Sequence, residues 1–349
     1  MQNNIFNVNN EDAIESNSTV IGNDGTVWNV VQQQEKETGR YGAHNILRES
    51  PGPTSLPKRK IVEGSVLSAF NLLIDNYIIK HIQECTETEA RSKLKCENWS
   101  TTYEEISAVI GIMFARGALA KGQPIEMLWS KTWGPNYFRE TLSRDRFREI
   151  MRFLRFDLKS TRSARLKTDK FALVSTVWDR FIENCITCYK PHEDITVDEQ
   201  LFPTKARCPF TQYIASKPDK FGIKFWLAAD VKTKYCLNGF PYLGKDHSRP
   251  ANQPLSEHVV LRFVEPFTGK GRNVTTDNFF TSVKLADKLK AKKTSLVGPM
   301  NRIRREIPRC IKQSRENLYT TRILRNDEST LTVYQCQFSK KRSFVEHTA

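Results

Sequence analysis

The spacing of apolar residues divides the chain into three stretches, and the first has no regular period. Residues 1–60 are rich in Asn, Gln, Ser, Thr and Gly, and their few apolar residues recur at neither a helical nor a strand period. Pro51, Pro53 and Pro57 would interrupt a helix in this stretch. We therefore expect residues 1–60 to form a disordered polar tail.

Helical spacing begins at about residue 61 and continues to about residue 190. Apolar positions three and four residues apart predict amphipathic helices over 66–78, 103–114, 124–129, 143–156 and 171–189. Thr101 or Thr102 would cap the second helix and Ser143 the fourth, and Pro191 follows the last. Residues 61–190 are expected to be a helical domain.

After Pro191 the apolar period shortens toward two, which is typical of strands. The candidate strands cover residues 194–198, 223–229, 235–240, 272–277 and 294–298. A capped helix over 282–290 would serve as the crossover that makes the last strand parallel to the one before it. The order predicts an α+β fold with a mixed sheet over 191–349.

Composition narrows the class of protein. The 349 residues are 39% hydrophobic, and no run approaches the ~18 apolar residues of a membrane-spanning helix. The first residues lack a basic segment followed by an apolar run, so no secretory signal is predicted. The formal net charge is +15; residues 1–50 carry −4, which leaves +19 on the remainder. Such a surface suits a polyanion rather than a membrane interior or a small-molecule substrate.

Basic residues gather in two places that could contact DNA phosphates. Residues 284–325 hold thirteen Lys and Arg against three Asp and Glu, and we single out Arg302, Arg304, Arg305 and Arg309. A simple solvated face is the alternative.

Lys217, Lys220 and Lys224 flank the candidate strands 194–198 and 223–229. They could hold DNA or simply be exposed on a hairpin. The aromatic residues near them are expected to pack in the core rather than stack on bases; these are Phe210, Tyr213 and Phe221.

Two acidic residues stand at strand ends. Asp198 closes one candidate strand and is followed by Glu199, and Asp277 closes another. If the strands are neighbours, both carboxylates project at one edge, where hard oxygen ligands suit Mg²⁺. Two such ions about 3.5–4 Å apart can activate an attacking oxygen and stabilise a leaving oxygen of a phosphodiester. An ordinary turn or cap role is the alternative on spacing alone.

Longer motifs favour the metal interpretation. Asp198-Glu-Gln and Asp277-Asn-Phe-Phe-Thr-Ser stand within ordered blocks at 194–203, 207–213, 216–226, 242–245, 271–282 and 285–289. In order and spacing these blocks closely resemble the piggyBac family of DNA transposases and their host-domesticated derivatives. The resemblance is dense between 194 and 308 and looser in the helical half.

The resemblance implies an RNase H-like catalytic core of the DDE/DDD type with Mg²⁺, in which Asp198 and Asp277 are the first two of three catalytic and metal-binding aspartates. It implies that residues 61–190 serve dimerisation and DNA binding. The family excises through a hairpin mechanism and inserts at TTAA, so double-stranded DNA, a nuclear location and a homodimer or a dimer with a related transposase are expected.

The chain departs from the family in its C-terminal part. Within these 349 residues no block resembling GVDxxDQ supplies the third aspartate, and no segment resembles the family's zinc-binding cysteine-rich domain, which we therefore expect to be absent. Pro299 and Asn301 replace a Thr and an Arg. We expect an incomplete core, no zinc, and a truncated transposase-derived DNA-binding protein whose strand-transfer chemistry is lost, because two carboxylates fix metal ions poorly.

Three other interpretations stay open. Asp327, Glu328 or Glu346 could replace the missing ligand, although none sits in a matching motif. A partner chain could complete an active metal-dependent transposase or nuclease. The chain could also be an architectural partner of an intact transposase.

The remaining motifs are short. Cys185 and Cys188 form a CxxC without a second pair, so two half-buried thiols on a helix are expected in place of a zinc site. The basic residues 58–60 follow Pro57 and suit either a nuclear-import signal or a solvated linker end.

Overall fold

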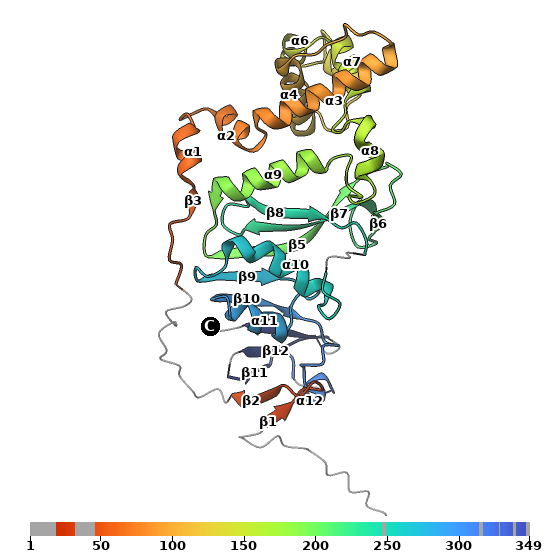
Figure 1. Cartoon of the computed structure of the whole chain (residues 1–349). Helices are drawn as coiled ribbons and strands as arrows, with labels where there is room; N and C mark the ends of the chain where they lie inside the picture. The colour runs from red at the N-terminus through yellow and green to blue at the C-terminus, as the bar shows by residue number, and fades with distance from the viewer. Residues whose placement is uncertain are drawn as a thin grey trace, which may run out of the picture.

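The structure is a computed structural model that describes residues 19–31, 46–245, 249–313, 317–327, 329–337 and 340–346. A group of helices lies at one end and a long mixed sheet extends away from it (Figure 1). The predicted α+β class with a mixed sheet is therefore confirmed.

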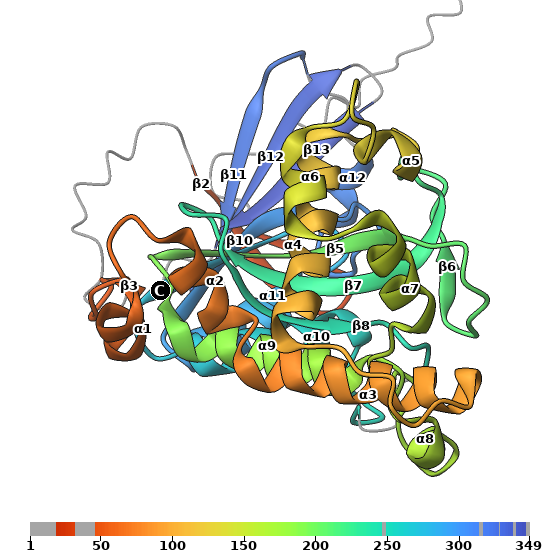
Figure 2. The same ribbon diagram turned by 90° about the horizontal axis from the view of Figure 1, so that it is seen from above.

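The helical end contains α1 (Ser55–Lys60), α2 (Val66–Leu73), α3 (Asn76–Leu94), α4 (Tyr103–Leu119), α5 (Ile125–Leu128), α6 (Asn136–Thr141), α7 (Arg144–Phe153), α8 (Lys159–Arg165) and α9 (Ser175–Cys188). Seen from above, α3 and α9 run side by side (Figure 2). Thr102 and Glu105 form a capping box on α4, and Ser143 caps α7, as the sequence predicts.

The apolar stretch 66–78, expected as one helix, is divided into α2 and α3. The Asp75 side chain accepts a hydrogen bond from the backbone N–H of Ile78 (3.1 Å) and pairs with Arg180 (2.7 Å). Asp75 is therefore the N-cap of α3, and a second helix begins where the apolar period alone shows no interruption.

The strands, including two near the N-terminus, are β1 (Thr19–Ile21), β2 (Val27–Val31), β3 (Gly52–Pro53), β4 (Tyr189–Lys190), β5 (Asp194–Pro203), β6 (Thr211–Tyr213), β7 (Phe221–Asp230), β8 (Cys236–Pro241), β9 (Arg272–Thr276), β10 (Thr294–Met300), β11 (Thr321–Arg325), β12 (Thr330–Gln337) and β13 (Lys340–Glu346). The helices α10 (Leu255–Val264), α11 (Val283–Lys290) and α12 (Arg309–Gln313) are inserted among them, with the 3₁₀ turn η2 (Glu265–Phe267) directly after α10.

Five neighbouring strands make the part of the sheet that carries the candidate site. Their order is β8–β7–β5–β9–β10; β9 is parallel to β5 and to β10, while β7 is antiparallel to β5 and to β8. This is the strand order of an RNase H-like core. β13, β12, β11, β2 and β1 extend the sheet beyond β10. The sequence analysis expected an incomplete core, but all five of these strands are present and paired. The three domain boundaries stay a prediction.

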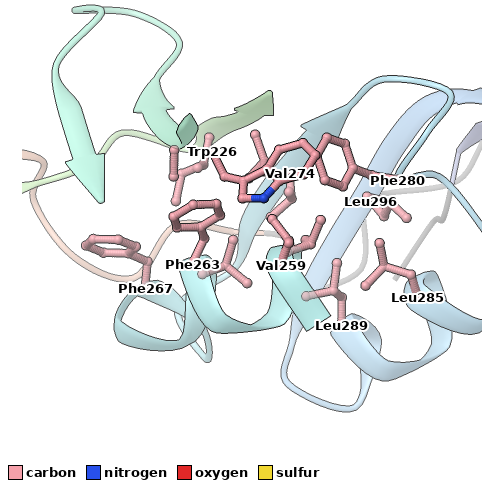
Figure 3. Close-up of a cluster of buried hydrophobic side chains, with 14 of the residues drawn as sticks. Trp226, Val259, Phe263, Phe267, Val274, Phe280, Leu285, Leu289 and Leu296 are labelled. Carbon is pink, nitrogen blue, oxygen red and sulfur yellow. The ribbon is translucent and has the colours of Figure 1, made fainter. Parts of the chain in front are cut away.

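A buried cluster joins α10 and α11 to this sheet. Phe263 of α10 and Leu285 of α11 meet Trp226, Val274 and Leu296 of the strands, and each of these side chains is buried (Figure 3). The α10 helix was not predicted from the sequence. Because both helices pack on the strands that carry the site, their apolar burial holds the strand ends in place.

The expected disordered tail is wrong for the part of residues 1–60 that the structure describes. β1 and β2 form a hairpin whose second strand pairs with β11, and Gly25 at the turn has a φ of 91°. Trp28 is fully buried, and its Nε1 donates to the carbonyl of Glu306 (2.9 Å). The missed signal is the Asn-Asp-Gly turn between two short β-branched runs.

The CxxC cysteines lie at the C-terminal end of α9. Both thiols are free. They are buried, whereas the sequence analysis expected them to be half-buried. Burial raises the pKa of the Cys185 thiol to about 12, with a smaller contribution from Cys236. Among the described residues, no helix has the length and apolar character needed to cross a membrane.

Replacing Trp28 with Ala should lower the free energy of unfolding by about 3–5 kcal/mol, because a filled core position becomes a cavity and the Glu306 carbonyl loses its donor. Chemical denaturation followed by circular dichroism measures the change. Val27→Ala, at a half-exposed neighbour in the same strand, is the control and should change stability by less than about 1 kcal/mol. An effect of Trp28→Ala as small as that expected for Val27→Ala would show that burial of the Trp28 ring adds little to the fold.

Candidate functional site

The register of two parallel strands brings the predicted acidic residues together. Val197 of β5 is opposite Thr276 of β9, so Asp198 and Asp277 follow at the same edge of the sheet. Oxygen atoms of Asp198, Glu199 and Asp277 all lie within 4.8 Å of one another. We call these three residues the acidic trio. The expected convergence of Asp198 and Asp277 is present, and their catalytic role stays a prediction.

Glu199 is the residue that the sequence analysis did not assign. Successive side chains in a strand point to opposite faces, so Glu199 is expected to face away from Asp198. β9, however, ends at Thr276, and beyond that point no strand of the described residues pairs with β5 on that side. This open edge gives both side chains access to the same space. The signal available in the sequence was the acidic residue directly after Asp198.

Hydrogen bonds fix the turn that carries Asp277. Its Oδ1 accepts from the backbone N–H groups of Phe279 (3.0 Å) and Phe280 (3.4 Å). Its carbonyl oxygen accepts from the Thr281 hydroxyl (2.7 Å). The carboxylate is thus held in place by the backbone of the segment that follows it, and only Thr281 contributes through its side chain.

Gly298 of β10 is required by the close approach of this turn. A Cβ at position 298 would lie 2.4 Å from both the carbonyl oxygen of Thr276 and the hydroxyl oxygen of Thr281. Neither atom can move without shifting the residues on either side of Asp277. The glycine therefore allows β10 to pack against β9 at the level of the acidic trio.

Two lysines neutralise part of the negative charge. The Nζ atoms of Lys217 and Lys224 lie 3.6 Å and 3.9 Å from Glu199 carboxylate oxygens. The Lys224 ammonium also lies 3.8 Å from the centre of the Trp226 ring. Burial lowers the pKa of Lys224, while the nearby carboxylates of Glu199, Asp277 and Asp198 oppose that shift.

The electrostatics of the acidic trio fit a cation. Burial raises the pKa of Asp277, the like charges of Asp198 and Glu199 raise it further, and the two backbone N–H groups oppose these effects. Carboxylate oxygens at one rigid strand edge are the donors that Mg²⁺ prefers. A divalent cation would relieve the repulsion, so the donor set and the charge both fit a metal ion. Asp198 and Asp277 would hold it, with Glu199 available as a third ligand.

Of the other acidic residues considered as replacement ligands, Asp327 does not join the acidic trio. Asp327 lines a separate pocket with Asp287 and Asn326. Glu328 and the side chain of Glu346 lie outside the described residues.

The predicted DNA-contacting arginines lie after β10, and one is tied to the Asp277 turn. Arg304 Nη2 donates to the carbonyl of Phe279 (3.0 Å). Arg305 is exposed, and the exposed Arg302 donates to the carbonyl of Lys312. Arg309 and Lys220 are exposed as well, outside these contacts.

An open groove begins beside Asp277, with a volume of about 540 Å³. The charged residues that solvent reaches in this groove are Lys284, Arg304, Arg305 and Asp24. Two further acidic residues of its wall, Glu257 and Glu306, are buried. Asn278, Phe279, Ser282, Asn301 and Ile303 complete the part nearest the trio. We call it the Asp277 groove. Its exposed charges are net positive and suit a phosphate backbone.

The aromatic residues near the lysines divide into two groups. Phe210 packs in the core against Phe171 and Phe225, as expected. Tyr213 and Phe221 are exposed and contact one another at a tilt, with ring centroids 4.9 Å apart, so the prediction of core packing is wrong for these two. The reason is that β6 is an outermost strand, where little else covers them.

Comparison with known proteins finds a family model and two human relatives that are similar to this chain. Residues 66–344 match the family model described as Transposase IS4. The human "PiggyBac transposable element-derived protein 3" is 28% identical over 62% of this chain and 37% of its own length. The human "PiggyBac transposable element-derived protein 2" is 26% identical over 71% of this chain and 42% of its own length.

A solved structure is similar over most of the chain. The cryo-EM structure of a piggyBac transposase synaptic complex with hairpin DNA superimposes with a TM-score of 0.78 and 33% sequence identity, over 85% of this chain and 63% of that chain. The chain therefore spans well under half of the human relatives and less than two thirds of the solved protein.

Without metal, the raised pKa of Asp277 predicts a pH-dependent loss of stability. The folded protein holds this proton more tightly than the unfolded chain. The contribution of Asp277 to stability is thus greatest below the ordinary pKa of 3.8 and is lost as the pH rises through the raised value. Asp277→Asn should remove this fall and make the metal-free protein more stable than wild type at pH 7, as measured by thermal unfolding across pH 4–8. A wild-type curve parallel to that of Asp277→Asn would contradict the prediction.

Divalent cations should make the wild-type chain more stable than Asp277→Asn. At about 100 times its dissociation constant, Mn²⁺ or Mg²⁺ should stabilise the wild-type chain by about 2.7 kcal/mol, and should stabilise Asp277→Asn far less. Asp194→Asn, at the first residue of β5 and four residues before Asp198, is the matched control and should keep the full effect. Equal stabilisation of all three proteins would show that the ion binds elsewhere.

Proposed function

Because this chain belongs to the transposase family whose model it matches, and is of the piggyBac type, we propose that it is a transposase-derived protein that binds double-stranded DNA along the Asp277 groove. The observation that carries the proposal is the chain of hydrogen bonds that connects Asp277, through Phe279, to Arg304 in the groove. Arg304 contacts the turn that holds Asp277, so a phosphate bound at the arginine would lie beside the carboxylates.

The complex of the similar solved protein with hairpin DNA supports DNA as the ligand. The basic surplus of the chain points the same way. Lys217 and Lys224 would add positive charge on the β7 side of the trio, and Arg302, Arg305 and Arg309 on the other. These contacts would hold the DNA backbone in position without distinguishing one base sequence from another.

We propose Mg²⁺ as the cation held by Asp198 and Asp277. When bound, such an ion activates an attacking oxygen and stabilises a leaving oxygen of a phosphodiester. The contribution of the chain is to hold the carboxylates at one strand edge and to direct cations at the phosphate. Glu199 is already paired with two lysines, which weakens it as a metal ligand. We therefore propose that strand-transfer activity is lost in this chain acting alone.

An active metal-dependent transposase or nuclease is the second candidate function. The position of Glu199 favours it, because a third carboxylate within 4.8 Å of both aspartates could replace the family's third aspartate once the lysines turn toward phosphates. A partner chain that supplies the missing ligand would have the same result.

Dimerisation and nuclear location are also part of the proposal. A homodimer, or a dimer with a related transposase that this chain assists architecturally, is supported by the family resemblance of the helical part. Lys58, Arg59 and Lys60 are exposed at the end of α1, where an import receptor could reach them.

DNA affinity should fall steeply with salt. If the groove neutralises three to four phosphates, the affinity for a duplex falls about 40- to 150-fold between 50 and 200 mM salt. Arg305→Ala should lower the slope of log K against log salt by about 0.9, measured by fluorescence anisotropy. Lys232→Ala, exposed in the turn at the far end of β7, is the control and should leave the slope unchanged. A salt-independent affinity would refute phosphate binding.

Strand cleavage separates the two candidate functions. Purified chain incubated with DNA and Mg²⁺ or Mn²⁺ should give no cleaved product above background on a denaturing gel. Metal-dependent product that disappears in both Asp277→Asn and Glu199→Gln would instead establish the active enzyme with Glu199 as its third ligand.

A further inference from the structure

An exposed aromatic ring lies at the entrance of the Asp277 groove. Phe279 follows Asp277 by two residues, and 43% of its surface is exposed, whereas the adjacent Phe280 is fully buried. Leaving an aromatic ring half in water gives up part of its burial energy. This ring therefore differs from the rest of the Asp-Asn-Phe-Phe-Thr-Ser segment, whose later residues are all buried.

Contacts on three sides fix the position of Phe279. Its backbone N–H donates to Asp277 Oδ1 (3.0 Å) and its carbonyl accepts from Arg304 (3.0 Å). Its ring is stacked on Trp226, with centroids 5.7 Å apart and an angle of 12°, and meets Phe280 edge-on at 5.0 Å. The ring is thus supported from inside while part of it stays open to solvent.

The surroundings of this ring suit one kind of ligand. Lys224 Nζ lies 5.8 Å from its centroid, and Lys284, Arg304 and Arg305 line the groove that it enters. Cations around an apolar ring match a ligand that carries anionic groups beside a flat π surface. A nucleotide has both, since its phosphate can meet the cations while its base covers the ring.

We propose that Phe279 is a stacking platform for one unpaired nucleobase of a DNA strand whose phosphate lies at the acidic trio. The inference deepens the proposed function and rests on it. A base inside a duplex is covered on both faces by its neighbours, so the platform selects a base released from the stack, as in gapped or single-stranded DNA. Stacking is tolerant of base identity because every base has a π face.

The test uses the full chain and two DNAs, a continuous duplex and the same duplex with a short gap that contains 2-aminopurine. Wild-type protein should quench the 2-aminopurine and bind the gapped DNA more tightly than the duplex. Phe279→Leu keeps an apolar side chain against Trp226 but has no π face, and should lose the quenching and about tenfold in affinity for the gapped DNA. Phe279→Trp should retain both.

Three controls separate stacking from other effects. Tyr319→Ala, at an aromatic residue that is 71% exposed away from the groove, should change neither signal. Phe279→Leu should lose more affinity for the gapped DNA than for the duplex, and should keep the stabilisation by Mn²⁺, which shows an intact Asp277 turn. Sedimentation of wild type and Phe279→Leu identifies the alternative in which the ring packs against another protein chain; a changed oligomeric state with unchanged quenching overturns the proposal.

The outcomes distinguish this inference from the function on which it rests. Duplex binding with salt dependence but with equal quenching by wild type and Phe279→Leu overturns the platform alone. A wild-type chain that binds neither DNA overturns the proposed function and the platform together. Loss of Mn²⁺ stabilisation in Phe279→Leu would assign the ring a structural role in the metal site instead of a contact with DNA.

Discussion

The parallel pairing of β5 with β9 is the constraint on which the candidate site depends. It places Val197 opposite Thr276, so the next residue of each strand is an aspartate at the same edge. Burial raises the pKa of Asp277, the like charges of Asp198 and Glu199 raise it further, and Lys217 and Lys224 offset part of the negative charge by pairing with Glu199. The rest of the core resists the repulsion between these like charges, because α10 and α11 bury their apolar faces on these strands (Figure 3).

The elements around this pairing form one connected structure. Gly298 lets β10 approach the Asp277 turn, and Arg304 ties the loop after β10 to the same turn. The N-terminal hairpin then holds that loop from outside, because Asn23 and Trp28 donate to the carbonyls of Arg305 and Glu306. Segments nearly 280 positions apart in the sequence thus fix the groove beside the carboxylates.

Local patterns predicted the five strands of the site region and most of the longer helices, but few of the shorter elements and not every element limit. The strands around Asp198 and Asp277, the crossover helix and its parallel strand follow from period and capping alone. The division at Asp75, the N-terminal hairpin and α10 did not, because each depends on partners distant in sequence: Arg180 for Asp75, β11 for β2 and the sheet for α10. A short apolar run buries little surface by itself, so it cannot be recognised as a strand from the sequence before its partner strand is known.

The sequence by itself determined the α+β class, the family resemblance and the two aspartates, because these are written in ordered motifs and in local periodicity. Only the tertiary structure decided that Glu199 lies beside the two aspartates. The alternation of side chains along a strand predicts that Glu199 points away from Asp198, but the sheet edge is open beyond Thr276 and both side chains reach the same space. The tertiary structure also decided which aromatic rings are covered. Phe280 is buried and Phe279 is half exposed, a difference set by the packing of Trp226 and the turn rather than by residue type.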